Sequence, residues 1–225
     1  MLPRSQFFPP AEQGDRDGLL MIGGRMTTER LVDAYRHGIF PWPFTDDPNR
    51  VAWWSPDPRA VIELEGFHVP RRLERTLRSG RFETSLNRAF PQVIAACAST
   101  GTRKNATWIT PALSEAYLAL HRAGWAHSVE VWRAGALVGG LYGVAVGGLF
   151  SGESMFHHER DASKAALVTL VAHLRARGYQ LFDIQQLTPH TAQFGAQEIP
   201  RREYLLRLRK ALEAQASFTD SAESG

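Results

Sequence analysis

The sequence predicts an α+β protein with a small N-terminal lobe and a larger C-terminal domain. Apolar runs with strand-like patterning cluster between residues 127 and 153, where short glycine-containing turns separate them. A helix, a strand and a second helix follow this cluster, each marked by an apolar stripe or run. At 225 residues with 44% hydrophobic residues, the chain is long enough to bury a substantial core.

The composition excludes several broad classes of protein. With 22% charged residues, the chain is neither disordered nor fibrous. The longest early apolar stretch, residues 18–24, is too short for a membrane span and follows an acidic segment, which also argues against a signal peptide. The single cysteine, Cys97, excludes an internal disulfide and fits a reducing compartment. We therefore expect a cytoplasmic protein, whose net charge of +3 favours an anionic partner without requiring one.

The N-terminal lobe is expected to span residues 1–59. Residues 1–16 are rich in proline, glutamine and charge, and they predict an irregular arm. Thr27 and Thr28 are the candidate caps of a helix that ends near Gly38. The segment 39–59 combines several prolines with three tryptophans and is too punctuated for a regular element. It is interpreted either as an aromatic plug between two lobes or as a stacking platform for a ring or a nucleobase.

An arginine-rich helix follows the first strand of the larger domain, which is expected to span residues 60–216. The run after Ala60 alternates enough to predict that strand. Arginines three and four residues apart lie on one face of a helix. Such a face is usually only solvated, yet the planar fork of arginine also suits phosphate contacts. The segment 90–98 predicts a small core helix. The arginines of interest are Arg71, Arg72, Arg75 and Arg78.

The middle of the chain predicts an antiparallel meander. A helix capped by Thr110 precedes it and stops near Gly124. Gly147 and Gly148 form a two-residue turn between the last two strands. The strands are expected at residues 127–132, 137–146 and 149–153.

One carboxylate stands out at the end of this meander. The glycine-spaced apolar run 138–156 contains a single acidic residue, Glu153. Glycine inside a strand often marks close approach of the backbone to a ligand, which favours a reaction centre here. A glycine turn with a solvated charge at the end of a strand explains the run equally well.

The last part of the chain predicts a helix ending at Gly178, a buried strand at 181–185 and a final helix beginning at Pro200. Residues 217–225 are expected to be disordered. A sheet followed by a helix, a strand and a helix resembles the acyltransferase fold of acetyl-coenzyme A enzymes. We therefore expect a GNAT-like domain with an antiparallel or mixed sheet flanked by helices.

The sequence does not support a coenzyme A donor. Enzymes of that fold hold the pyrophosphate of coenzyme A with a glycine-containing loop at the start of a helix. Here the corresponding residues 157–163, HHERDAS, contain no glycine. The paired histidines His157 and His158 have no third ligand at a suitable spacing, so no metal and no role are assigned to them.

Eight motifs in order carry a resemblance to one bacterial family. They cover the chain from about residue 18 to residue 212, which makes a chance similarity untenable. On them the chain resembles the leucyl/phenylalanyl-tRNA–protein transferases. The motifs are GIFPW (38–42), WWSPDPRA (53–60), TWIT (107–110), VGG-YGV (138–144), FSGESMF (150–156), ASK (162–164), HTA (190–192) and EIPRR (198–202).

The resemblance implies the transfer of leucine or phenylalanine from aminoacyl-tRNA to the α-amino group of a protein that begins with Arg or Lys. The product is a peptide bond that marks the protein for degradation. No cofactor and no metal are implied, and whether methionine is also transferred stays open. A monomer is expected because the sequence has no obvious exposed apolar stripe.

The resemblance also implies roles for individual residues. Glu153, Asp183 and Gln185 are the implied catalytic residues, with Asp183 holding Gln185 for the incoming amine and Glu153 binding the acceptor or the terminal adenosine. A relay through a substrate hydroxyl or phosphate is the alternative to Gln185 as base. The implied aminoacyl pocket consists of Leu141, Phe150, Leu170 and Leu174. The implied stacking residues near the end of the tRNA are Tyr35, Trp42, Trp108 and Tyr117. The arginines of residues 71–78 become candidates for tRNA phosphate contacts.

Two other functions remain open from the residues themselves. An acyltransferase using coenzyme A or acting on cell-wall peptides shares the predicted fold, but the missing glycine loop and the short chain argue against it. A non-catalytic tRNA-binding module would leave Glu153, Asp183 and Gln185 together without a purpose.

Overall fold

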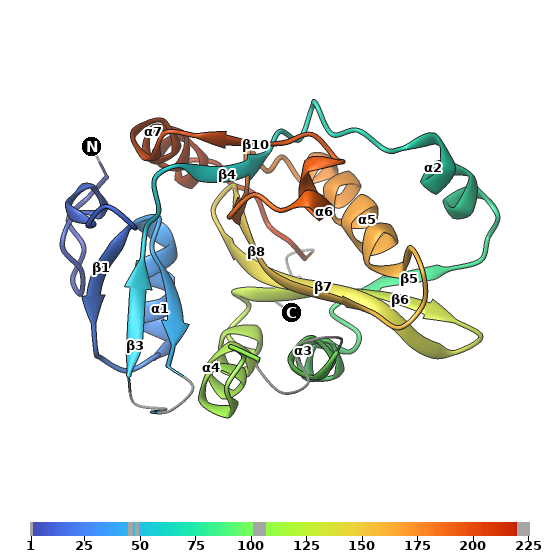
Figure 1. Ribbon diagram of the computed structural model, residues 1–225, viewed down its shortest axis with the longest axis horizontal. Helices are drawn as coiled ribbons and strands as arrows, with labels where there is room; N and C mark the ends of the chain where they lie inside the picture. The colour runs from blue at the N-terminus through green and yellow to red at the C-terminus, as the bar shows by residue number, and fades with distance from the viewer. Residues whose placement is uncertain (1, 45–46, 48–49, 101–106, 220–225) are drawn as a thin grey trace, which may run out of the picture.

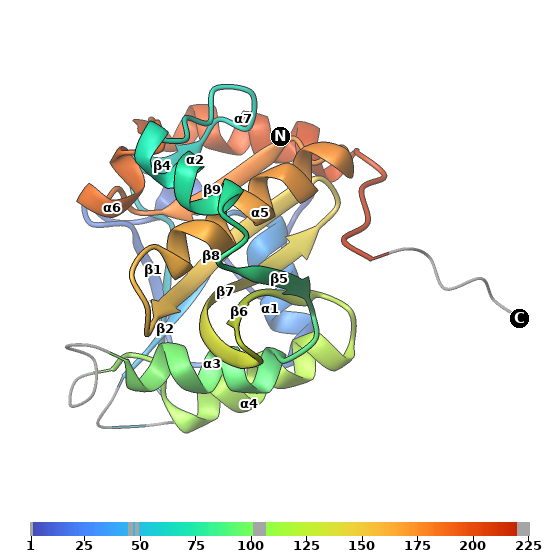
Figure 2. The same cartoon turned by 90° about the vertical axis from the view of Figure 1, so that its right-hand side faces the viewer.

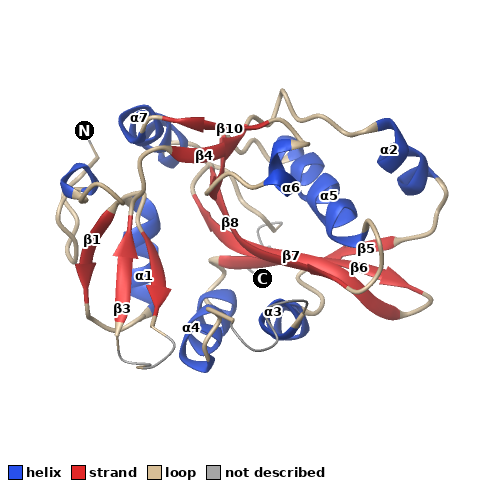
Figure 3. Cartoon of the chain, viewed as in Figure 1, coloured by secondary structure: helices blue, strands red, loops and turns tan. Residues whose placement is uncertain are grey.

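The computed structural model describes residues 2–44, 47, 50–100 and 107–219. Among these residues the strands form two sheets, a three-stranded sheet in the order β1-β3-β2 and a seven-stranded sheet in the order β10-β4-β9-β8-β7-β6-β5. Figure 1 shows the small sheet at one side of the molecule and the large sheet at the other, and Figure 3 shows helices packed around both. The α+β class with a small N-terminal lobe is therefore confirmed. In the described part of the chain, no helix is long and apolar enough to cross a membrane.

The small lobe contains more regular structure than the sequence predicts. Its helix begins after Thr27, whose hydroxyl accepts a hydrogen bond from the Arg30 backbone N–H, as expected for a cap. The prediction that segment 39–59 contains no regular element is wrong, because two paired strands form within it. The lobe consists of the short 3₁₀ helix η1 (Ala11–Gln13), β1 (Leu19–Ile22), α1 (Thr28–Arg36), β2 (Phe40–Pro43) and β3 (Val51–Trp54).

The large sheet is antiparallel except where β8 and β9 run parallel. The expected meander is confirmed, including the turn at Gly147 and Gly148 between the paired residues Val146 and Leu149. The strands are β4 (Arg59–Ile62), β5 (Glu83–Leu86), β6 (Ala126–Arg133), β7 (Ala136–Val146), β8 (Leu149–His157), β9 (Leu181–Gln185) and β10 (Ala196–Ile199).

Helices cover both faces of the large sheet and divide the core into two apolar clusters (Figures 1 and 2). On one face, α5 packs over β6, β7 and β8, and α2 lies against α5. On the other face, α3 and α4 contact the sheet and share a cluster with α1, α7 and the small lobe. The helices are α2 (Arg71–Arg78), α3 (Phe90–Ser99), α4 (Pro111–Arg122), α5 (Ala162–Ala176), α6 (Pro189–Ala192) and α7 (Arg201–Leu212).

Both ends of the chain pack more closely than the sequence predicts. In the expected arm, Phe8 is buried and its ring lies 4.8 Å from the ring of Trp53. In the expected disordered tail, Phe218 is 3% exposed and belongs to the cluster beneath α5. Residues 220–225 of that tail lie outside the described residues. Large aromatic side chains explain both differences, since each buries enough apolar surface to fix a chain end.

Gly139 allows α5 to approach the sheet closely. A Cβ at this position would lie 2.6 Å from the Cβ of Ala162, the first residue of α5. No other residue fits without displacing the helix or the strand, so the glycine sets the distance between them. This matters for the site, because α5 and β8 form its two sides.

The replacement Gly139→Ala is expected to lower the free energy of unfolding by about 1–3 kcal/mol through overpacking. Urea unfolding of the purified variant provides the measurement. Gly66→Ala is the matched control, because a Cβ there meets its nearest neighbour at an ordinary 3.5 Å. Equal losses in the two variants would contradict the close-approach argument.

Candidate active site

The carboxylate of Glu153 lies where the parallel strands β8 and β9 part. Their pairing runs from Leu149 opposite Leu181 to Ser151 opposite Asp183, and Glu153 follows two residues later. On its other side β9 pairs with β4 along its length, and this pairing continues past the end of the β8 contact to Gln185, opposite Ala60. The separation of the strands leaves space beside Glu153 that backbone pairing would otherwise fill.

Three side chains from three different elements donate hydrogen bonds to Glu153. The Tyr35 hydroxyl on α1 and the Gln185 amide nitrogen on β9 both lie 2.8 Å from its Oε1. The Tyr117 hydroxyl on α4 lies 3.0 Å from its Oε2. The two tyrosine hydroxyls also contact each other directly. The small lobe and the large domain therefore jointly fix this carboxylate.

The surroundings of Glu153 tune its protonation. Burial raises its pKa to about 7, and the charge of Asp183 adds to this, while the two tyrosine hydroxyls and Arg59 oppose it. Burial, followed by the charge of Glu153, raises the pKa of Tyr35 and Tyr117 well above the ordinary value. Both phenols are therefore neutral donors, and Glu153 titrates close to neutral pH.

A buried ion pair lies beneath this carboxylate. Asp183 accepts two bonds from Arg59, at 2.9 Å from Nε and 2.7 Å from Nη2, and both side chains are 1% exposed. The Tyr204 hydroxyl adds a bond of 3.0 Å and the Ser151 hydroxyl one of 3.3 Å. Sequence reasoning assigned no role to Arg59 or Tyr204. Arg59 lies in the WWSPDPRA motif and opens an apolar run, but neither signal set it apart from its neighbours.

Asp183 also holds Gln185, as the sequence analysis expects, but through the backbone. The Gln185 N–H donates to Asp183 Oδ1 at 2.9 Å. Gln185 has a φ of 63°, a left-handed conformation that is unfavourable for this residue type. Such strain persists only where surrounding contacts enforce it, and it aims the Gln185 amide at Glu153.

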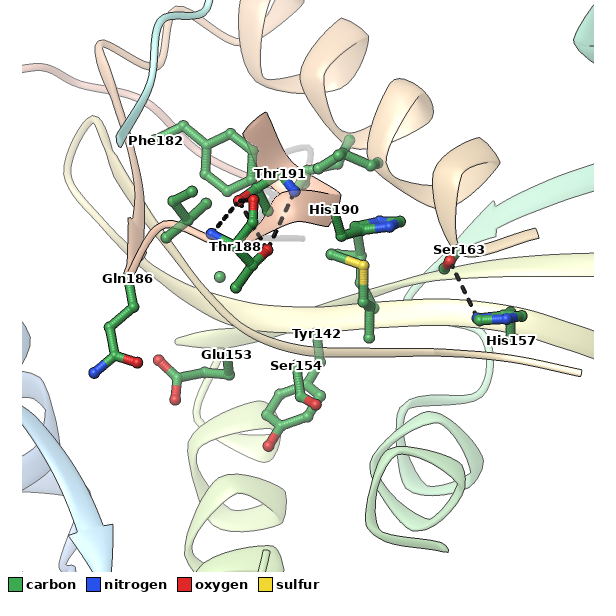
Figure 4. A pocket seen from close by; sticks show the side chains of 16 residues that line it. Tyr142, Glu153, Ser154, His157, Ser163, Phe182, Gln186, Thr188, His190 and Thr191 are labelled. Atoms are coloured by element: carbon green, nitrogen blue, oxygen red, sulfur yellow. Dashed lines mark hydrogen bonds between the residues drawn. The ribbon is translucent and has the colours of Figure 1, made fainter. Parts of the chain in front are cut away.

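A cavity of about 430 Å³ opens beside Glu153. Figure 4 shows Glu153 and Gln186 at one end of it and His157 with Ser163 at the other. Its wall combines apolar side chains with polar ones, among them Thr188 and Thr191, which lie between the two ends in Figure 4. The apolar lining consists of Leu141, Met155, Leu167, Leu170, Phe182 and Ile184.

Two of the four predicted pocket residues line this cavity, and two do not. Leu141 and Leu170 contribute to its wall. Phe150 and Leu174 are fully buried and lie outside the lining, so their placement in the wall is corrected. Phe150 instead packs behind the wall, with its ring 5.9 Å from that of Phe182. Periodicity and motif position could not separate the layer that faces a ligand from the layer behind it.

The predicted stacking residues also divide into two pairs. Trp42 on β2 is 41% exposed and stacks on Trp108, with the ring centroids 4.8 Å apart and the planes 17° from parallel. Tyr35 and Tyr117 are buried, so neither ring offers a face to a base. Their hydroxyls hold Glu153, and this arrangement gives no support to a stacking role for their rings.

The arginines of residues 71–78 are exposed on α2. Arg78 pairs with Glu74 at 2.8 Å on the same exposed helix. Figure 1 shows α2 at the end of the large sheet that lies away from the small lobe. The structure therefore does not bring these arginines together with Trp42 and Trp108.

Histidines that the sequence analysis left aside border the cavity. His157 lines it, and its Nδ1 lies 3.5 Å from the Ser163 hydroxyl. His190 lines it too, and burial lowers the pKa of this imidazole. The described residues contain no group of three side chains able to hold a metal ion.

A held carboxylate beside an apolar cavity, in an α+β fold, defines an enzyme-like site for a substrate with an apolar group. Comparison with known proteins identifies the family. Residues 61–209 match the family described as Leucyl/phenylalanyl-tRNA protein transferase, and residues 24–57 match its N-terminal domain. The chain belongs to the leucyl/phenylalanyl-tRNA–protein transferases.

Two relatives that carry the family's name agree with this assignment, and one solved structure shows a weak likeness. The leucyl/phenylalanyl-tRNA–protein transferase of Syntrophotalea carbinolica is 51% identical over 91% of this chain and 88% of its own length. That of Anaeromyxobacter sp. (strain K) is 50% identical over 94% of this chain and 91% of its own. An aminoglycoside acetyltransferase from a soil metagenomic sample is 15% identical, with a TM-score of 0.39 over 51% of this chain and 88% of its own.

The replacement Glu153→Gln tests the raised pKa of Glu153 through the pH dependence of the free energy of unfolding. The carboxyl ionises freely above about 4.5 in the unfolded chain but resists ionisation up to about 7 in the folded protein. The folded state therefore binds more protons in this window, and wild-type stability falls relative to the variant as the pH rises. Urea unfolding at pH 5 and pH 8 measures the difference, and a pH-independent difference would refute the raised pKa.

The replacement Arg59→Met is expected to lower the free energy of unfolding by about 3–5 kcal/mol, because it leaves the Asp183 charge buried without its main partner. The double variant with Asp183→Asn is expected to lose less than the single one, since no unpaired charge remains. Chemical denaturation of the single and double variants checks this. Strictly additive losses would show that the two side chains do not act as a pair.

Proposed function

We propose that this protein transfers Leu or Phe from aminoacyl-tRNA to the α-amino group of a protein beginning with Arg or Lys, and so marks that protein for degradation. The observation that carries the proposal is the carboxylate of Glu153 at the end of an apolar cavity, in a chain of this family. Because aminoacyl-tRNA is the donor, the proposed place of action is the cytoplasm. We propose that the protein acts as a monomer.

The apolar part of the cavity wall is the proposed contact for the aminoacyl side chain. Its wall of leucine, isoleucine, methionine and phenylalanine suits an unbranched or γ-branched apolar group. An apolar pocket discriminates by only about 1–3 kcal/mol per methylene group, so its shape must exclude side chains that branch at Cβ. The flexible Met155 in the wall favours use of both Leu and Phe, and extends the proposal to Met.

The proposed chemistry needs few groups, because the ester of aminoacyl-tRNA is already activated. The acceptor amine attacks the ester carbonyl, a C–N bond forms, and the bond to the ribose oxygen breaks. Gln185 donates its amide N–H to Glu153, which leaves its amide oxygen to orient the incoming amine. Glu153, with a pKa near 7, takes the proton that the amine loses. That proton passes to the leaving ribose oxygen, directly or through a substrate hydroxyl.

The stacked pair Trp42 and Trp108 is the proposed contact for the terminal adenosine. Trp42 is exposed in the small lobe, and a nucleobase of any sequence can stack on an indole. The exposed arginines of α2 are proposed to contact phosphates of the acceptor stem. Because α2 lies at the far end of the large sheet, such contacts require the tRNA to pass along the sheet's length (Figure 1).

The deciding experiment measures transfer of radiolabelled Leu from Leu-tRNA to a peptide beginning with Arg. The same peptide beginning with Ala and a parallel reaction with acetyl-coenzyme A are the controls. Label on the Arg peptide alone, from Leu-tRNA alone, is the expected result. Transfer from acetyl-coenzyme A, or no transfer from Leu-tRNA, would overturn the proposal.

Single-turnover rates test the residues. Glu153→Gln is expected to slow transfer by about 100-fold through loss of the proton acceptor. Gln185→Ala is expected to slow it by about tenfold or more through loss of amine orientation. Gln197→Ala, on the exposed strand β10, is the matched control and should retain the wild-type rate. Wild-type rates in both site variants would remove Glu153 and Gln185 from the chemistry.

A further inference from the structure

The aromatic side chain of Phe218 packs into the large domain after the last helix has ended. It is 3% exposed and lies beyond residue 209, where the family match stops. Its backbone carbonyl accepts a hydrogen bond of 2.8 Å from His173 on α5. Its ring stacks on His127 at 4.2 Å and on Phe150 at 5.6 Å. The chain end is therefore fixed at one defined place.

The ring of Phe218 is connected to the cavity by two aromatic contacts. Phe218 lies against Phe150 with their planes 27° apart, and Phe150 meets the edge of Phe182 at 71°. Phe182 lines the cavity, whereas Phe150 does not. The three rings thus form a series of contacts from Phe218 to the cavity wall, and Phe150 is the middle member.

The middle ring has little room to move while Phe218 is present. Phe150 is fully buried, and a Cβ at Gly143 on the neighbouring strand would lie 2.5 Å from its ring. Close packing on that side leaves the space now filled by Phe218 as a direction of retreat. Because protein interiors are packed as densely as crystals, removing one ring lets its neighbours shift into the void.

We propose that Phe218 is a positioning residue that sets the depth of the aminoacyl pocket, and through it the preference between Leu and Phe. This proposal rests on the assignment of the cavity to the aminoacyl side chain. With Phe218 in place, Phe150 supports Phe182 against the cavity and keeps the pocket shallow. Without it, Phe150 and Phe182 retreat, and the deeper pocket favours the larger side chain.

The test compares kcat/KM for Phe-tRNA and Leu-tRNA, with a peptide beginning with Arg as acceptor. In Phe218→Ala, the ratio of Phe to Leu is expected to rise by about threefold to tenfold, at or below the smallest effect of one methylene group in an apolar pocket, because Phe218 acts through two other rings. The change is expected in KM, because the catalytic groups are untouched. Phe218→Leu, which refills most of the void, is expected to restore a ratio nearer to the wild type.

Phe8→Ala is the matched control. Phe8 is 7% exposed and packs on Trp53 in the small lobe, so its loss destabilises a chain end without reaching the cavity. The ratio of kcat/KM for Phe-tRNA to that for Leu-tRNA in Phe8→Ala should remain that of the wild type. If Phe218→Ala lowers use of both donors equally, as Phe8→Ala does, Phe218 serves stability alone and the proposal is overturned.

The variant Leu170→Ala distinguishes the role proposed for Phe218 from the assignment of the cavity to the aminoacyl side chain. Leu170 lines the cavity directly, so its truncation must change the ratio if the cavity holds the aminoacyl side chain. A shift in Leu170→Ala without a shift in either Phe218 variant overturns the role of Phe218 and leaves the pocket assignment standing. No shift in any of them overturns the pocket assignment itself, and the proposal with it.

Discussion

The buried ion pair between Arg59 and Asp183 is the interaction on which the site depends. It joins the neighbouring strands β4 and β9, the second and third strands from the β10 edge of the large sheet. Arg59 also donates to the Gly38 carbonyl at 3.0 Å, next to the strand that opens the aromatic segment of the small lobe. Its guanidinium lies over the rings of Phe40 and Tyr204, which brings in α7 as well. A charge buried this deeply is stable only when every partner is in place, so the pair links the position of four elements.

Much of the fold could be predicted from local sequence, because caps and apolar stripes are local signals. Thr110 and Pro111 begin α4 as expected, and the buried residues of α3 are those on the predicted stripe. The strand β2 could not be predicted, because Pro41 and Pro43 normally exclude a strand. It is tolerated because β2 is an edge strand, where a missing N–H need not be paired within the sheet.

Less of the site could be predicted, because its contacts join distant parts of the chain. The family resemblance singled out Glu153, Asp183 and Gln185, and the structure brings these three together. The same resemblance marked Tyr35 and Tyr117 but not what they do, since Tyr35 meets Glu153 across 118 positions of sequence. Arg59 was missed for the same reason, its partner being 124 positions away. A residue's neighbours across a sheet decide its role, and no local pattern reveals them.

The way in which Glu153 is held limits what it can still bind. Among the described residues, Tyr35 and Gln185 donate to Oε1 and Tyr117 donates to Oε2. A carboxylate offers about four acceptor positions, so about one remains, and it is on Oε2. A guanidinium binds a carboxylate most strongly as a fork that engages both oxygens, which this arrangement prevents. An arginine that approaches Glu153 thus has no advantage over a lysine, and any ranking between these two cations must arise from other groups on the enzyme.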